Sequence, residues 1–344
     1  MLESRLLQGC CDIHLHVAPS LIPRSADIVT VARQAEAAGY RAIVIKDHHY
    51  NSAPACDQIQ RYLFNGSPLR IFGSIALNNS VGGVNPYVVE AAINFGVKIV
   101  WLPTVSARQH MEFHKAGGAF PSTRVALQER PITLTDEKGD LKQEVRDVIH
   151  LVAQAPDVVL ATGHANAAEI EKVVEEAVSS GVKKILVDHP TFGLGANLEQ
   201  VKCWASLGCW IEHCGTISAP EMGEKGTAIS AIADYIREIG VDHTILSSDY
   251  GQAKFGNCIE GMSRYLQALA NTGFTQEEIH KMSGENPGKL LSLVIMPLRL
   301  MLSASYCISS SIKTLNGWPG ISSIYDKGIS LILLSFASAR LSSA

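Results

Sequence analysis

The sequence predicts a (β/α)8 barrel, and three observations predict it. First, short apolar runs rich in β-branched residues alternate with amphipathic helical stretches from residue 8 onward, which is typical of βα units around a parallel sheet. Second, these apolar runs number eight. Third, the regular pattern ends near residue 292, and barrels of this kind commonly occupy about 250 residues or more as one domain.

The expected strands are the eight apolar runs themselves. They cover residues 9–17, 41–49, 69–77, 97–103, 157–164, 183–190, 208–214 and 243–249. Two of the helices between them show apolar residues at i, i+3 and i+4 spacing and end at Gly39 and Gly181. Near the end of the pattern, Thr275 and Glu278 are spaced as a capping box, and "GENPGKLL" provides a proline for the start of a last short helix.

Two segments depart from the barrel pattern. Residues 104–140, after the fourth strand, are longer than a usual βα loop, and "RVALQERPITLTDEKGDL" predicts a β-hairpin that turns near "DEKGD". After residues 1–292, which we assign to the barrel, residues 293–344 form an atypical serine-rich tail whose single acidic residue is Asp326. This tail is either weakly ordered or an artefact of translation, or else an appended interaction or membrane-associating segment.

Composition favours a small-molecule partner. A net charge of −4 gives no reason to expect nucleic acid, and no apolar stretch is long and continuous enough to indicate membrane association. Eight cysteines without a C-x-x-C pair, and no apolar targeting segment at the N-terminus, predict reduced thiols in a cytoplasmic protein. A homo-oligomer is compatible with these features.

Polar side chains gather at the carboxyl ends of the expected strands, where barrel enzymes carry their chemistry. One such histidine is usually an ordinary hydrogen-bonded residue, but seven of the twelve histidines of the chain lie at these ends. Burying so many imidazoles and carboxylates is costly unless something pairs with them, and a divalent cation is the simplest partner. The residues concerned are His14, His16, Lys46, Asp47, His48, His49, His164, His189, Glu212, His213 and Asp249.

The motifs "DIHLH", "TGHA", "DHP", "SSDYGQ" and "ENPGKLL" resemble those of the amidohydrolase superfamily, in the same order and over residues 8–292. The resemblance implies that His14 and His16 bind a metal ion, and that His164 and His189 bind the same ion or a second one. It also implies that Asp249 binds metal and accepts a proton from the attacking water. The expected reaction is hydrolysis of an amide, cyclic amide, ester or lactone, with zinc as the first candidate metal and manganese or iron as others.

The sequence departs from the resemblance at the fourth strand. Many members with two metals have a bridging carbamylated lysine or a glutamate there, whereas this chain has "VWLPT", ending at Thr104. Lys46 could supply a bridge from the second strand. The alternatives for Lys46 are a salt bridge to a neighbouring carboxylate or a contact with the substrate.

Four further residues near the strand ends receive supporting roles. We expect His48 to line the substrate pocket, and either His48 or His189 to polarise the carbonyl group that is attacked. Glu212 is an additional candidate ligand. Asp12 lies two residues before His14 and is expected to support the metal ligands from below.

Three residues outside the strands have two interpretations each. His110 and His114 are four residues apart and share a helix face, so they belong either to a solvated helix or to a lid over the metal. Arg24, in the first βα loop, either binds an anionic substrate or is simply an exposed arginine.

Other functions remain open on the sequence. Barrels with the same ligands also catalyse decarboxylation or hydration of small carboxylic acids. Phosphoesterases of the histidinol-phosphatase type begin with an H-x-H strand as well. A barrel that only binds a ligand is the non-enzymatic alternative, and metal content separates it from the others.

Overall fold

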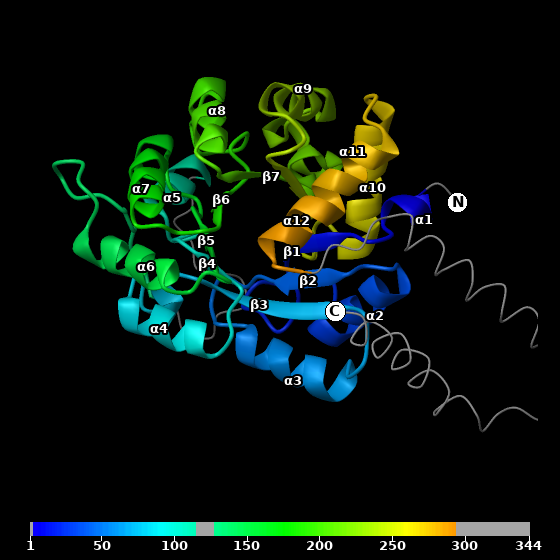
Figure 1. Ribbon diagram of the computed structural model, residues 1–344, viewed down its shortest axis with the longest axis horizontal. Coiled ribbons are helices and arrows are strands. Elements are labelled where there is room, and N and C mark those ends of the chain that lie inside the picture. The colour runs from blue at the N-terminus through cyan, green and yellow to red at the C-terminus, as the bar shows by residue number, and fades with distance from the viewer. Residues whose placement is uncertain (1–2, 115–126, 294–344) are drawn as a thin grey trace, which may run out of the picture. The chain divides into compact units, whose positions relative to one another are not determined.

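The computed structural model describes residues 3–114 and 127–293. One sheet of eight parallel strands, ordered as in the sequence, forms the centre of this part, and Figure 1 shows helices on its outside. The strands are β1 (Cys11–Leu15), β2 (Ala42–Ile45), β3 (Arg70–Ala76), β4 (Ile99–Trp101), β5 (Val159–Ala161), β6 (Ile185–Val187), β7 (Trp210–Cys214) and β8 (Thr244–Ser247). The predicted (β/α)8 barrel is therefore confirmed, and each expected strand stretch contains an observed strand.

Backbone hydrogen bonds close the barrel between its first and last strands. The amide of Asp249, just after β8, donates to the carbonyl of His14 at 2.7 Å, and the amide of His16 donates to the carbonyl of Tyr250 at 2.9 Å. Because these bonds lie at the carboxyl ends of β1 and β8, the closure itself brings three of the predicted metal ligands together.

Helices follow the strands along the chain. They are α1 (Glu3–Leu6), α2 (Ile28–Ala37), α3 (Ala53–Leu63), α4 (Pro86–Asn94), α5 (Arg108–His114), α6 (Gln143–Ala153), α7 (Ala167–Ser179), α8 (Leu198–Ser206), α9 (Ile229–Ile239), α10 (Cys258–Asn271), α11 (Gln276–His280) and α12 (Asn286–Leu290). Shorter turns are η1 (Asn79–Val81), η2 (Gly215–Ser218), η3 (Pro220–Lys225) and the π-helical η4 (Lys281–Glu285).

Local signals in the sequence start and end these helices as expected. Asn166 and Glu169 form a capping box at the start of α7, and Gly181 follows its end with φ +81°, a conformation that glycine adopts without strain. The capping box of Thr275 and Glu278 is also present, at the start of α11.

The apolar core has an inner and an outer layer. The inner layer consists of side chains inside the barrel, among them Ile13, Val44 and Trp101, and Leu290 and Leu291 belong to the same cluster. The outer layers lie between the strands and the surrounding helices. The inner layer fills the interior of the barrel, so it is a packed core rather than a channel.

The insertion after β4 begins with α5, and its residues 115–126 lie outside the described part of the chain. The predicted turn near "DEKGD" is present, because Thr135 and Leu141 form an antiparallel bridge and the Asp136 amide donates to the Asp140 carbonyl at 2.9 Å. Within residues 127–141 the pairing is limited to single bridges. The Glu169 carboxylate accepts from the Leu134 amide at 2.7 Å and so attaches the insertion to α7.

Almost all of the predicted tail, residues 294–344, lies outside the described residues. The division of the chain at residue 292 therefore stays a prediction. Among the residues that the structure describes, no helix combines the length and apolar character needed to cross a bilayer.

Candidate metal centre

A cavity of about 320 Å³ opens at the carboxyl ends of the strands. Histidines dominate its lining, although they come from distant parts of the chain: from β1 and the residues after it, from the ends of β2, β5 and β6, and from α5. They are His14, His16, His48, His110, His114, His164 and His189. Five of the seven strand-end histidines named from the sequence thus line one cavity, and His49 and His213 do not.

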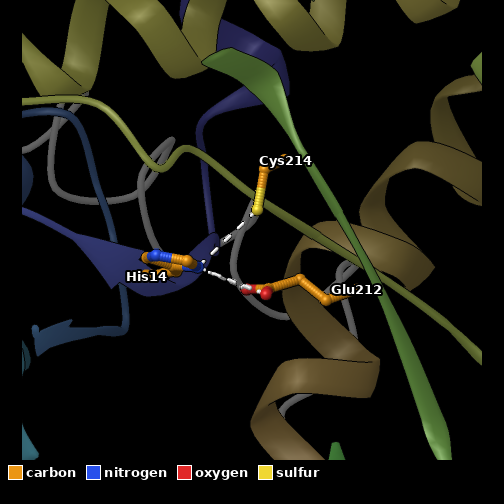
Figure 2. A group of neighbouring side chains, drawn as sticks. All are labelled: His14, Glu212 and Cys214. Atoms are coloured by element: carbon orange, nitrogen blue, oxygen red, sulfur yellow. Dashed lines mark hydrogen bonds and ion pairs between the residues drawn. The ribbon is translucent and has the colours of Figure 1, made fainter. Parts of the chain in front are cut away.

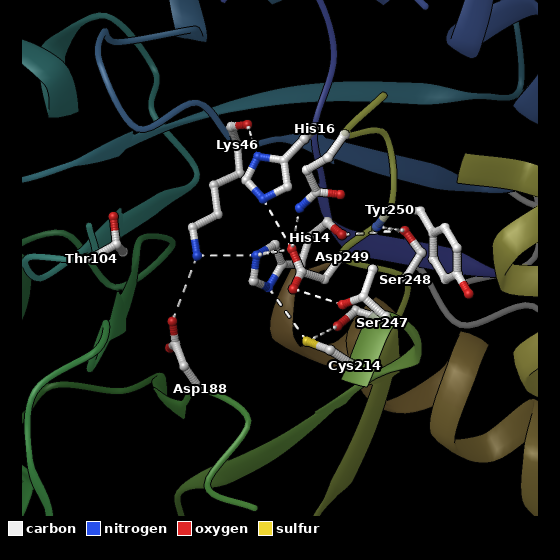
Figure 3. Close-up of polar contacts among 12 residues, drawn as sticks. His14, His16, Lys46, Thr104, Asp188, Cys214, Ser247, Ser248, Asp249 and Tyr250 are labelled. Carbon is white, nitrogen blue, oxygen red and sulfur yellow. Dashed lines mark hydrogen bonds and ion pairs between the residues drawn. The ribbon is translucent and has the colours of Figure 1, made fainter. Parts of the chain in front are cut away.

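One group of potential ligands is formed by His14, His16 and Asp249. Asp249 Oδ1 lies 3.2 Å from His14 Nε2 and 3.0 Å from His16 Nε2. One ligand atom of each residue lies within 4.8 Å of the others, which is close enough for a single ion to bind all three. Figure 3 shows the two imidazoles and the carboxylate converging from β1 and the end of β8.

In both histidines of this group, the ring nitrogen that does not face Asp249, Nδ1, has a polar partner of its own. His14 Nδ1 lies 3.2 Å from both carboxylate oxygens of Glu212, and His16 Nδ1 donates to the carbonyl of Lys46 at 2.9 Å (Figures 2 and 3). A carboxylate and a carbonyl only accept, so the Nδ1 atoms carry hydrogen, and the Nε2 atoms, which face Asp249, are the nitrogens left to bind a metal. This is the usual support of metal-binding histidines, and the three residues therefore fit a divalent cation.

Charge in this group favours a cation. Burial and Lys46 oppose protonation of His14, but the carboxylates of Asp249 and Glu212 outweigh them and raise the pKa of His14 to about 9. Burial, followed by Arg24, lowers the pKa of His16 to about 3. Although burial opposes its ionisation, the neighbouring histidines hold the pKa of Asp249 well below its usual value. A cation that binds His14 Nε2 thus replaces a proton there.

Local backbone geometry positions Asp249. The residue has φ +53°, which aspartate tolerates better than most side chains, and Thr216 Oγ1 donates to its Oδ2 at 2.9 Å. Two residues later, a Cβ at Gly251 would lie 1.7 Å from the His16 carbonyl oxygen, so only glycine permits this approach of the loop after β8 to β1.

A second group of potential ligands lies across the cavity. His164, Asp188 and His189 bring one ligand atom each to within 4.8 Å of one another. Burial raises the pKa of Asp188, and burial lowers the pKa of His164 well below its usual value and that of His189 to about 4. Both carboxylate oxygens of Asp188 lack a hydrogen-bond partner, and so does His189 Nδ1. The structure thus separates the predicted histidine ligands into two pairs.

Lys46 lies between the two groups. Its Nζ is 3.1 Å from His14 Nε2, 3.7 Å from Asp188 Oδ2 and 3.8 Å from the centre of the Trp101 ring. Of the interpretations made from sequence, a salt bridge to a neighbouring carboxylate is the one that matches this arrangement. Asp188, which the sequence reasoning did not single out, is that carboxylate, and its position at the end of an apolar strand before His189 was the available signal.

His48 is oriented by a polar pair behind it. Its Nδ1 lies 2.9 Å from Thr104 Oγ1, which accepts from Asn78 Nδ2 at 2.7 Å. Asn78 Oδ1 accepts from the amides of Thr104 and Ser106, which fixes the orientation of its amide group. We assign the Thr104 hydroxyl hydrogen to His48 Nδ1, and the Nε2 of His48 then carries hydrogen. Thr104, which follows the fourth strand, therefore orients the His48 ring.

Glu212 and Asp12 act on neighbours rather than facing the cavity. Glu212 lies behind His14 together with Cys214, whose Sγ is 3.6 Å from His14 Nδ1 (Figure 2). Burial raises the pKa of the Cys214 thiol well above its usual value, so this sulfur is protonated when no metal is bound. Asp12 Oδ1 accepts from the amides of Ser248 and His14 at 3.0 and 3.2 Å and so supports the loop before Asp249.

His110 and His114 belong to the cavity. Both line it from α5, and His110 Nδ1 lies 2.8 Å from His164 Nδ1. Burial lowers the pKa of His110 to about 3. The lid interpretation agrees with this position, although no residue of α5 is fully buried.

The interpretation of Arg24 as an exposed arginine is wrong. Its side chain is 1 % exposed, with Nη2 3.7 Å from Asp47 Oδ2. A backbone bridge between Arg24 and Gln252 joins the first βα loop to the loop after β8. His213 is also outside the cavity, with its ring 6.0 Å from that of Tyr235.

A family model described as "Family of unknown function (DUF6282)" matches residues 9–212, more than half of the sequence. The chain belongs to this family. The matched DUF6282 region includes the four histidines predicted as ligands, and Asp249 lies beyond it. A search of curated proteins found no match.

Solved structures share the fold of this DUF6282 chain. An amidohydrolase from Pseudomonas aeruginosa is 13 % identical, with a TM-score of 0.57 and coverage of 84 % of this chain and 98 % of its own. The dipeptidase AC, a metallopeptidase, is 11 % identical, with a TM-score of 0.54 and coverage of 83 % and 98 %. A mutant organophosphorus hydrolase from Deinococcus radiodurans is 13 % identical, with a TM-score of 0.51 and coverage of 83 % and 94 %. The amidohydrolase-type barrel expected from the resemblance is thereby confirmed as the fold.

Proposed function

We propose that the chain is a metal-dependent hydrolase that cleaves an amide, cyclic amide, ester or lactone bond of a small molecule. The observation that carries the proposal is the convergence of His14 Nε2, His16 Nε2 and Asp249 Oδ1, at 3.0 to 3.2 Å, beside an open cavity. Three protein ligands with space for water or substrate are typical of catalytic metal sites, whereas structural sites use four protein ligands.

Zinc is the metal that we propose, because two imidazoles and a carboxylate suit it, and manganese or iron suit the same ligands. A divalent cation supplies the nucleophile in such a site, since it lowers the pKa of water that it binds towards about 7.

Asp249 is the proposed proton carrier. Its carboxylate is ionised, since the neighbouring histidines hold its pKa well below the usual value, and Thr216 holds Oδ2 in place. Asp249 accepts the proton of the attacking water and returns it to the leaving nitrogen or oxygen.

His48 and His189 are the proposed electrophilic residues. With Thr104 donating to its Nδ1, His48 can donate a hydrogen bond from Nε2 to the oxygen that gains negative charge. The pKa of His48 is lowered by burial, so this imidazole is neutral near pH 7. His189 lines the same cavity and can donate in the same way.

The test combines metal analysis with a substrate panel. Purified protein is analysed for bound metals and then assayed against lactams, lactones, amides and phosphoesters, with and without added Zn²⁺ or Mn²⁺. We expect bound metal and hydrolysis of one carbonyl class. We expect both to be lost in a His14→Ala, His16→Ala double variant.

Asp249→Asn examines the proton transfer in the same assay. We expect a loss of at least about 100-fold in kcat, the usual contribution of general acid-base catalysis. Asp234→Asn, an exposed carboxylate on α9, is the matched control and should retain full activity. Full activity of Asp249→Asn with its metal retained would contradict the assigned role. Absence of metal and of metal-restored activity in the wild type would favour a ligand-binding barrel.

A second candidate is decarboxylation or hydration of a small carboxylic acid. Lys225 and Lys254 line the cavity, and Asp249 is the only carboxylate among its described lining residues. This balance favours an anionic ligand. Adding small carboxylic acids to the panel separates the two reactions, because decarboxylation releases CO₂.

We also propose a cytoplasmic location. The seven cysteines in the described part of the chain are all free, as expected in a reducing compartment. A cavity of about 320 Å³ is in the size range of sites for small molecules, which are the partners that we propose.

A further inference from the structure

One buried ammonium group separates the two groups of potential ligands. Lys46 is 0 % exposed, and its Nζ contacts His14 Nε2 from the first group at 3.1 Å and Asp188 Oδ2 from the second group at 3.7 Å. Figure 3 shows Lys46 reaching from the end of β2 to a point between His14 and Asp188.

The surroundings of Lys46 are built for a cation. The face of Trp101 lies 3.8 Å from Nζ, and the negative face of an aromatic ring attracts an ammonium group. A buried cation needs a paired anion, and Asp188, which is also 0 % exposed, is the nearest carboxylate. His14 Nε2, 3.1 Å from Nζ, is a second polar neighbour of this group.

A metal ion in the second group would need the same carboxylate. Asp188 is the only acidic member of the group formed with His164 and His189, and its Oδ2 already faces Nζ. An ion bound to this oxygen would lie near the ammonium group, and both groups are buried, so repulsion between the like charges would be stronger than in bulk water.

The first group also lies near Lys46, with Nζ 3.1 Å from His14 Nε2, but it has two carboxylates rather than one to balance a divalent cation. Of these, Asp249 faces the two histidines, and Glu212 lies behind His14. When His14 Nε2 binds an ion, the ammonium group of Lys46 loses this contact but retains Asp188 as its partner.

We propose that Lys46 is a built-in counter-ion of Asp188 that limits the cavity to one divalent cation, bound by His14, His16 and Asp249. The inference rests on the proposed metal site and goes beyond it by setting the number of ions. In this arrangement His164 and His189 remain free of metal and available to the substrate.

Metal stoichiometry tests the proposal without any substrate. Each purified protein is saturated with Zn²⁺, desalted and analysed for zinc per chain, and titration calorimetry counts the sites independently. We expect one ion in the wild type and in Lys46→Arg. We expect two in Lys46→Met, because Asp188 is then free to bind the second ion with His164 and His189, and one again in the double variant Lys46→Met, Asp188→Asn.

Lys98→Met is the matched control, because Lys98 also lies near an aromatic ring, with Nζ 5.4 Å from the centre of Phe72, but precedes β4 at the opposite end of the barrel. It should bind one ion. Circular dichroism confirms folding, and Lys46→Gln replaces Lys46→Met if that variant does not fold.

The outcomes are distinguishable. Two zinc ions in the wild type, or one in the folded Lys46→Met or Lys46→Gln protein, overturn the inference but leave the hydrolase proposal intact. A wild-type protein that binds no zinc or other divalent metal overturns the proposed function and the inference with it.

Discussion

Two residues of the candidate centre have a backbone conformation that most side chains avoid. Asp249 has φ +53° and His189 has φ +21°. Aspartate and histidine enter this region more readily than most residues, and such conformations are common where a side chain must be aimed at a ligand. Asp249 lies two residues after the end of β8, and His189 lies two residues after the end of β6. At both positions the side chain lines the cavity.

Glu212 provides the prediction at this scale. Its carboxylate holds His14 Nδ1 at 3.2 Å, so Glu212→Gln keeps an acceptor but removes the charge that makes the imidazole a strong ligand. We expect the Kd for Zn²⁺ to rise about 10- to 100-fold, as is usual for outer partners of metal ligands. Competition with a zinc chelator measures the Kd of each protein for Zn²⁺.

Glu171→Gln, an exposed glutamate on α7, serves as the control and should leave the Kd unchanged. An unchanged Kd in a folded Glu212→Gln protein would mean that His14 does not depend on this carboxylate.

At the scale of elements, the loops after the strands determine what enters the cavity. α5 brings His110 over the site, and Gln109 Nε2 donates to the carbonyl of Gly193 at 2.7 Å, which joins the insertion to the loop after β6. Gly163 has φ +63°, and a Cβ there would lie 2.3 Å from the carbonyl oxygen of Leu102. His164 therefore follows a glycine that the close approach of β4 and β5 requires.

The capping box of α7 gives a prediction about stability. Asn166 Oδ1 accepts from the Glu169 amide at 3.0 Å, so Asn166→Ala leaves an amide of the first turn without its partner. We expect a loss of about 1 kcal/mol in the free energy of unfolding and a Tm lower by about 2–4 °C, measured by thermal denaturation.

Ser179→Ala, at the exposed end of the same helix, should change the free energy of unfolding by less than about 0.5 kcal/mol. Equal shifts in the two variants would show that the capping box does not stabilise the barrel.

At the scale of the whole molecule, the barrel buries most of its thiols. Cys203 is the one exposed cysteine of the seven that the structure describes, and burial raises the pKa of Cys10, Cys11, Cys56 and Cys209 to about 12. Thiol reagents attack the thiolate, and a raised pKa reduces its population at any pH below about 12.

Thiol titration with Ellman's reagent at pH 8 therefore has a defined expected result. In a Cys307→Ser background, which removes the cysteine outside the described residues, we expect one fast-reacting thiol in the native protein and six more after denaturation. Cys203→Ser should abolish the fast reaction. Rapid reaction of several thiols in the native protein would contradict the burial of the barrel interior.

Much of the site was predictable from positions along strands. His14, His16, His164, His189 and Asp249 follow apolar runs, and parallel strands in a barrel bring their carboxyl ends to one face. Asp188 was not singled out because it lies next to His189, and its partner depends on where Lys46 reaches across the barrel. The same holds for Thr104, whose role depends on its contact with His48.

The sequence by itself determined the strand count, the helix caps and the residues that can bind a metal, because these depend on local pattern and on spacing along the chain. Only the tertiary structure decided that the potential ligands form two groups with Lys46 between them, that Glu212 supports His14, and that Arg24 is buried. These facts depend on distances between side chains far apart in sequence, which packing sets and local patterns do not record.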